Sequence, residues 1–181
     1  MSSDTLPLLK GRNITLRKAR PEDADARLAL GSDPHIHEMF GGSRETLAPI
    51  TTPDAAAWVR HLAEHPFAWV IEHRVPIGEI RLDRLDKQDR RASLAIGIFD
   101  PTSLGKGLGT EAIRLILDFA FRTLKLHRIS IRVLAYNTRA IRAYQKCGFV
   151  IEGREREAGL VNGQWHDDII MGLLEHEFVA T

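Results

Sequence analysis

A glycine-rich turn between an apolar stretch and an amphipathic stretch constrains the fold of this chain more than any other feature of its sequence. Residues 92–99 have the character of a buried strand, and residues 107–124 carry apolar side chains close to helical spacing. Gly105, Gly107 and Gly109 stand at alternate positions where the helix should begin. The first N–H groups of a helix have no internal partners, and the helix dipole adds partial positive charge there. The turn therefore predicts a site for an anion, typically a phosphate.

Two common nucleotide-binding patterns are absent from this turn. The pattern Gly-x-x-x-x-Gly-Lys-Ser/Thr is missing, which argues against a P-loop enzyme. The pattern Gly-x-Gly-x-x-Gly is also missing, and the turn follows an antiparallel region, which argues against a dinucleotide fold. Lys106 could add a full positive charge. Spacing alone leaves open the alternative that the glycines only form a tight strand-to-helix turn.

The order of the predicted elements changes at this turn. Before it we expect four strands, at 13–18, 67–71, 77–82 and 92–99. We expect helices that begin at Pro21 and that span 34–40 and 52–65, the last with Thr52 as its N-cap. A turn at 74–76 and a charged loop at 83–91 connect the later strands. After it we expect a strand at 128–134, a helix at 137–147 ended by Gly148, and strands at 149–151 and 164–174 around Asn162-Gly163. This order puts a parallel crossover in the middle of a mixed sheet. We expect an α/β fold of the mixed α+β kind, forming a single domain over residues 1–181.

Composition narrows the class of protein. The formal net charge of +1 provides no global field for nucleic acid or for a membrane surface. No apolar run approaches the ~18 residues that a membrane span needs. Cys147 is the only cysteine and cannot form an internal disulfide, and Met1–Asp4 lacks the features of a signal peptide. We therefore expect a cytoplasmic protein that uses neither nucleic acid nor a membrane as partner.

Two motifs resemble the GNAT superfamily of N-acetyltransferases. Residues 104–112, Leu-Gly-Lys-Gly-Leu-Gly-Thr-Glu-Ala, are similar to the family's acetyl-CoA loop, although Leu104 stands where Gln or Arg is usual. Residues 137–149, from Asn to Gly-Phe, resemble the second family motif. Residues 152–156 and 162–167 are similar to the branch that includes ribosomal-protein alanine and spermidine acetyltransferases. The resemblance spans about residues 13–174 and implies a mostly antiparallel sheet, splayed open near its middle and flanked by helices, with pantetheine in the opening.

The resemblance also implies acetyl-CoA as co-substrate, without a metal, and a set of contacts to it. It implies pantetheine contacts from Ile98 and Phe99, pyrophosphate contacts from Gly105, Lys106, Gly107, Leu108, Gly109 and Thr110, and further cofactor contacts from Asn137, Ala140, Tyr144 and Lys146. A glycine inside a strand often marks a bulge or a close backbone approach, so Gly97 would suit a bulge that opens the sheet.

Tyr144 matches the family tyrosine that protonates the departing CoA thiolate. An amine attacks the thioester carbonyl, and negative charge develops first on oxygen and then on sulfur. Backbone N–H groups can stabilise the oxygen, and a neutral hydroxyl with a pKa of about 10 can donate to the thiolate. No covalent intermediate is required, so we interpret Cys147 as a core residue rather than a nucleophile.

Several candidate residues stay open at this point. Glu79 could act as general base, but a chain of waters to solvent would serve equally well. Arg139 and Arg142 could reach the 3′-phosphate of CoA or could simply be exposed helical residues. His61 and His65 share a helix face and could form a metal pair, but no third metal ligand is evident. His35 and His37 lie in the region that lines the acceptor site in similar proteins, or they are simply exposed to solvent.

The sequence predicts an N-acetyltransferase that moves an acetyl group from acetyl-CoA to a primary amine by direct attack. The amine could belong to a protein or peptide N-terminus or to a small molecule. A polyamine would need an acidic pocket, and arginines are mixed among the acids of the first half, which are Glu22, Asp23, Asp25, Asp33 and Glu38. The alternative function is a non-catalytic acetyl-CoA sensor on the same fold. A homodimer is one oligomeric state that stays open.

Overall fold

The computed structural model describes residues 6–179, so the predicted absence of a signal peptide at Met1–Asp4 lies outside the described residues. The framework is an eight-stranded sheet in the order β1-β2-β3-β4-β5-β6-β8-β7. The strands are β1 (Leu9–Lys10), β2 (Thr15–Arg17), β3 (Ala68–His73), β4 (Val75–Asp86), β5 (Arg91–Ile98), β6 (Arg128–Leu134), β7 (Val150–Val161) and β8 (Gln164–Leu174). The helices are α1 (Asp23–Leu30), α2 (Pro34–Met39), α3 (Thr52–Glu64), α4 (Leu108–Asp118) and α5 (Thr138–Lys146).

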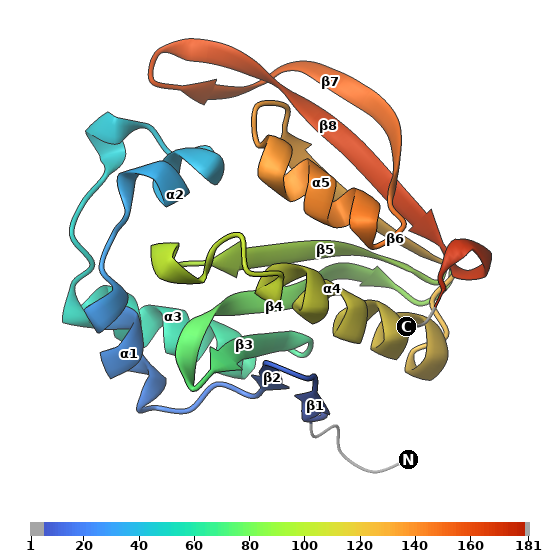
Figure 1. The fold of residues 1–181 in the computed structure, drawn as a ribbon, viewed down its shortest axis with the longest axis horizontal. Coiled ribbons are helices and arrows are strands. Elements are labelled where there is room, and N and C mark those ends of the chain that lie inside the picture. The colour runs from blue at the N-terminus through green and yellow to red at the C-terminus, as the bar shows by residue number, and fades with distance from the viewer. Residues whose placement is uncertain (1–5, 180–181) are drawn as a thin grey trace.

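The sheet opens in its middle, between β5 and β6. Neighbouring strands pair antiparallel everywhere except at this pair, which is parallel. The parallel pairing covers three residue pairs and ends at Ser93 and Ser130, after which the two strands separate. The predicted crossover and the splayed sheet are therefore confirmed. Because the opening lies where β5 leads into α4, the glycine turn stands beside it (Figure 1).

Gly97 does not form the predicted bulge. β4 and β5 keep a continuous register through the pairs Glu79↔Gly97 and Gly78↔Ile98. The glycine is needed for a different reason, because a Cβ atom at this position would lie 3.0 Å from the Phe99 ring and 3.1 Å from the Phe40 ring. The sheet opens through the divergence of β5 from β6 rather than through a bulge in β5.

Two layers of helices cover the sheet. In Figure 1, α4 crosses in front of the sheet and α3 lies behind it. Ile113 and Ile116 of α4 are fully buried in the main core, together with Trp69 of β3. On the other face a smaller cluster forms around Leu62 of α3. This two-sided burial explains why the central strands carry apolar residues at consecutive positions.

Some predicted boundaries were wrong for local reasons. The N-cap of α3 is Thr51 rather than Thr52, because Thr51 and Asp54 form a reciprocal capping box. Val75 and Pro76 belong to β4, and Arg74 alone makes the turn with a φ of 65°. β4 continues to Asp86 and β7 runs to Val161. Both extensions are rich in charged residues, so apolar alternation could not reveal them. Within residues 6–179, no helix combines the length and the apolar character needed to cross a membrane.

Candidate active site

A cavity of about 410 Å³ opens where β5 ends and α4 and α5 begin. Ten of the predicted cofactor contacts line it: Ile98, Gly105, Gly107, Leu108, Gly109, Thr110, Asn137, Ala140, Tyr144 and Lys146. Arg139 and Arg142 of α5 also stand on its wall, which brings two cations toward the glycine turn. We call this cavity the donor cavity.

The glycine turn has the backbone geometry of an anion site. Gly107 is the N-cap of α4 with a φ of 81°, and Gly105 has a φ of 74°. A Cβ atom at either position would meet no protein atom within 4 Å, so the dihedral angle rather than space explains these glycines. The amides of Leu108 and Gly109 belong to the first turn of α4, where a helix offers no internal acceptor. The end of the cavity therefore presents unpaired N–H groups to a phosphate.

Two predicted contacts are not brought to the donor cavity. Lys106 is exposed and does not line it. Phe99 does not line it either, and its ring packs edge-on against Phe40 and Trp58. Its amide nitrogen already donates to the carbonyl oxygen of Ile77 at 2.8 Å, so it cannot donate to pantetheine.

Tyr144 is a buried residue whose hydroxyl has no hydrogen-bond partner within residues 6–179. Burial, with a smaller contribution from Cys147, raises the pKa of Tyr144 to about 12. The hydroxyl is therefore neutral at physiological pH and can donate a proton. Burial also raises the pKa of Cys147 to about 11, which keeps that thiol protonated and makes it a poor nucleophile.

A second cavity of about 380 Å³ occupies the opening between β5 and β6. It shares Met39, Phe40, Ile96, Asn137 and Tyr144 with the donor cavity. We call it the acceptor cavity, because a second reactant in it would reach Tyr144 without passing the glycine turn. Its own lining includes Arg132 and Asp168, two residues that the sequence had not indicated as site residues.

Helix α2 covers the junction of the two cavities with Met39, a residue that the sequence had not indicated. Asn137 accepts a hydrogen bond from the Ala140 amide as the N-cap of α5, and its Nδ2 donates to the Met39 carbonyl at 3.3 Å. The Tyr136 hydroxyl donates to the Glu38 carbonyl at 2.6 Å. Asn137 thus positions α5 and α2 together. No local pattern indicates this, because the partners are 98 positions apart in the chain.

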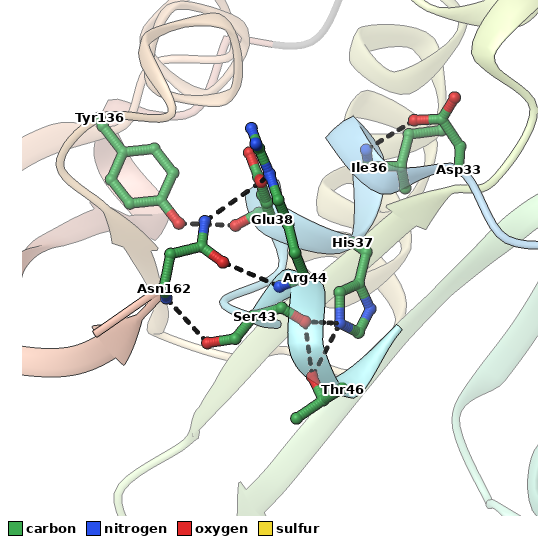
Figure 2. Close-up of polar contacts among 9 residues, drawn as sticks. All are labelled: Asp33, Ile36, His37, Glu38, Ser43, Arg44, Thr46, Tyr136 and Asn162. Carbon is green, nitrogen blue, oxygen red and sulfur yellow. Dashed lines mark hydrogen bonds and ion pairs between the residues drawn. The ribbon is translucent and has the colours of Figure 1, made fainter. Parts of the chain in front are cut away.

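The segment after α2 is also tied to the turn between β7 and β8 (Figure 2). The Arg44 amide donates to Asn162 Oδ1 at 2.8 Å, and the Asn162 amide donates to Ser43 Oγ at 2.8 Å. Asn162 Nδ2 donates to Glu38 Oε1 at 3.1 Å, and the same carboxylate pairs with Arg44. These contacts join the two halves of the chain across the opening of the sheet.

Glu79, the candidate base, lines neither cavity. Its side chain is buried, and its carboxylate accepts a hydrogen bond from Trp58 Nε1 and pairs with Arg81. These contacts give Glu79 a structural role between β4 and α3.

The histidines also have local partners or face solvent. His65 Nε2 lies 3.1 Å from Asp83 Oδ1, and His37 Nε2 lies 3.0 Å from the Ser43 carbonyl oxygen. His35 and His61 are exposed. Over residues 6–179, no three His, Cys, Asp or Glu side chains cluster as metal ligands would.

The splayed sheet, the anion-binding turn at the start of α4 and the two cavities that share Tyr144 are the arrangement expected of an acyl-CoA transferase. Comparisons with known proteins agree. Residues 13–150 match the family model described as an acetyltransferase (GNAT) domain. The chain is 44% identical over 175 residues to the probable N-acetyltransferase YjcK of Bacillus subtilis (strain 168), covering 92% of this chain and 97% of that protein.

Two further relatives are named for a polyamine. The chain is 35% identical over 103 residues to spermidine N(1)-acetyltransferase of Escherichia coli (strain K12), covering 57% of this chain and 55% of that protein. The crystal structure of Vibrio cholerae spermidine N-acetyltransferase with CoA and spermine is similar with a TM-score of 0.76 and 25% identity, covering 91% and 97% of the two chains. This chain belongs to the GNAT family of acetyltransferases, whose reaction transfers acetyl from acetyl-CoA to an amine.

Proposed function

We propose that this protein binds acetyl-CoA in the donor cavity and acetylates a primary amine held in the acceptor cavity. The observation that carries the proposal is that Tyr144 belongs to the walls of both cavities. The pyrophosphate would bind the amides at the start of α4, and Arg139 and Arg142 would contact the outer phosphates. The acetyl thioester would then lie near Tyr144.

The reaction follows from these positions. The amine attacks the thioester carbonyl carbon and forms the C–N bond, while negative charge develops on the carbonyl oxygen. When the intermediate collapses, the C–S bond breaks and Tyr144 gives its proton to the thiolate. The attacking nitrogen gives up one proton through water, and an equivalent proton returns to the Tyr144 oxygen, so the products are the amide and the free CoA thiol. Burial raises the pKa of Tyr144 to about 12, so the hydroxyl carries its proton throughout the physiological pH range and is present as a donor when the thiolate forms. Direct attack needs no covalent enzyme intermediate, in keeping with the protonated Cys147 thiol.

We propose that the acceptor amine belongs to a protein or peptide N-terminus or a small amine rather than to a polyamine. Three acids that could have attracted a polyamine already have structural partners. Asp23 pairs with Arg17 at 2.7 Å, Asp33 caps α2, and Glu38 pairs with Arg44. An acidic pocket for several ammonium groups therefore has little support.

We also propose that residues 1–181 act as one domain in the cytoplasm. The continuous eight-stranded sheet supports one domain, and the single buried Cys147 suits a reducing compartment. A homodimer stays a prediction.

Thiol release from acetyl-CoA tests the proposal against the sensor alternative. A panel of peptide amides, alkylamines and polyamines is mixed with the protein and acetyl-CoA, and free CoA and acetylated product are measured together. An enzyme yields equal amounts of CoA and acetylated amine. Tight binding of acetyl-CoA without product from any amine would identify a sensor instead.

A further inference from the structure

Asp168 is a buried carboxylate on the wall of the acceptor cavity. The residue is 3% exposed, and its Oδ2 lies 2.6 Å from Arg132 Nε. Its Oδ1 has no hydrogen-bond donor within residues 6–179. Burial raises the pKa of Asp168, which reflects the cost of holding a charge there. Within residues 6–179 no fully buried side-chain oxygen lacks a hydrogen-bond partner, so the free Oδ1 must be accessible, and a ligand in the cavity can reach it.

Asp167, the neighbour of Asp168 in β8, is a carboxylate with a structural role. Asp167 accepts a hydrogen bond from the Glu157 amide at 2.9 Å and pairs with Arg154 at 2.8 Å. It thereby holds the irregular part of β7, where the register shifts between Glu155 and Gly159. Asp167 lines neither cavity, whereas Asp168 accepts no backbone N–H and lines the acceptor cavity.

Arg132 supplies a cation beside Asp168. Its side chain is 60% exposed, and it also approaches Glu155 with Nη1 at 3.4 Å. A guanidinium carries five N–H donors in a fixed fork, so these two contacts leave donors for a ligand. The acceptor cavity therefore presents a free carboxylate oxygen and free guanidinium donors side by side.

We propose that Asp168 and Arg132 together recognise an acceptor whose amine stands next to a carbonyl group, as at a peptide N-terminus. The amine donates to Asp168 Oδ1, and the neighbouring carbonyl oxygen accepts from Arg132. A simple alkylamine can use only the first contact, and a polyamine brings further positive charge toward Arg132. The inference rests on the proposed function, because it assigns the substrate of the same site.

Kinetics with matched acceptors test the pair. The acceptors are tetra-alanine amide with a free N-terminus and n-butylamine, which lacks the carbonyl. The variants are Asp168→Asn and Arg132→Gln, with Asp167→Asn and Arg154→Gln as matched controls from the pair outside the cavities. We expect Asp168→Asn to lower kcat/KM for the peptide amide by about tenfold or more, as for loss of a hydrogen bond to a charged group. Arg132→Gln should lower the ratio of kcat/KM for the peptide amide to that for n-butylamine.

Calorimetry separates recognition from turnover and from folding. Tetra-alanine amide is titrated into each CoA-saturated protein, and circular dichroism checks the fold. We expect peptide binding to weaken in both cavity variants and to change less than about twofold in both controls. If Asp168→Asn does not fold, Arg132→Gln still tests the proposed recognition. The Arg132 side chain is largely exposed, so its replacement should leave the protein folded.

Three results would overturn the inference: equal use of peptide amide and n-butylamine by the wild type, no peptide binding to the CoA-saturated wild type, or equal effects in cavity and control variants. Failure of the wild type to bind acetyl-CoA would instead refute the proposed function.

Discussion

Tyr144 shows how one residue can be both packed and reactive. Its ring belongs to the main core and meets Phe149 edge-on, with ring centroids 6.0 Å apart. The residue also lines both cavities. Packing holds the Tyr144 ring in place, and burial raises the pKa of its hydroxyl, so the oxygen keeps its proton. The two properties can be separated by changing the hydroxyl alone.

The change Tyr144→Phe removes the hydroxyl and keeps the ring. The loss falls on the transition state, because the thiolate that needs the proton exists only after attack. We expect kcat to fall by roughly 10²–10⁴-fold, the usual contribution of general acid catalysis. Acetyl-CoA affinity, measured by calorimetry, should stay within about threefold. A variant with wild-type kcat would return Tyr144 to a purely structural role, and one that lost donor binding would make it a cofactor contact.

The pKa of Tyr144 predicts the alkaline side of the pH profile. A tyrosine with an ordinary pKa of about 10 would be half ionised at pH 10, and an acid of that kind would lose about half of its activity. Since burial raises the pKa to about 12, the neutral form persists through pH 10 and is lost only above pH 11. We expect kcat with saturating amine to stay level between pH 8 and pH 10. A twofold fall centred on pH 10 would contradict the assignment.

At the scale of elements, the start of α4 is where the local sequence most directly produces the proposed phosphate site. β5 ends at Ile98, and the Asp100 side chain accepts hydrogen bonds from Thr102 N and Ser103 Oγ. These contacts shape the turn before the glycines. Gly105 and Gly107 then adopt positive φ, so α4 begins with its free amides on the cavity wall.

Gly107→Val should abolish measurable acetyl-CoA binding while the protein stays folded. A valine strains the positive φ, and its side chain fills the space in front of the free amides. Gly163→Val is the matched control, because Gly163 has a φ of 73°, a Cβ atom there would meet no atom within 4 Å, and the residue lies outside both cavities. Both variants should lose stability by about 1–2 kcal/mol in urea unfolding. Normal CoA affinity in folded Gly107→Val would show that the glycines only make a turn.

At the scale of the whole molecule, the site exists because the sheet is incomplete. β5 and β6 pair over three residues and then diverge, which leaves room for pantetheine and for the amine. The α2 segment and the β7–β8 turn close the far side through Asn162 (Figure 2). A cofactor bound in the donor cavity would contact elements from both halves of the chain, so its binding should stabilise the native state.

Acetyl-CoA should raise the melting temperature of the protein, whereas ATP and NAD should not. A ligand that binds only the native state adds about 2.7 kcal/mol at a hundredfold excess over its dissociation constant. The two nucleotides serve as controls, since the turn lacks the motifs that bind them. A thermal scan checks this, and an equal shift with NAD but none with CoA would refute the assignment of the donor cavity.

Sequence by itself determined the features that depend on neighbouring residues. The glycine turn, the helix after it and the Asn162-Gly163 turn follow from local dihedral preferences and from apolar spacing. These features, with the two motifs, were enough to predict the splayed sheet, the family and ten residues of the donor cavity. Nine of these ten residues lie in the two motif segments, 104–112 and 137–149, so local patterns sufficed.

Only the tertiary structure decided which distant residues share the acceptor cavity. Met39, Arg132 and Asp168 come from α2, β6 and β8, and no local pattern links them. The tertiary structure also decided the partner of the Phe99 amide, which donates to the carbonyl oxygen of Ile77 in the neighbouring strand. Residue spacing along the chain predicts dihedral angles and periodicity, because both depend on neighbouring residues. A cavity between diverging strands depends on contacts between distant segments, and these form only when the whole chain folds.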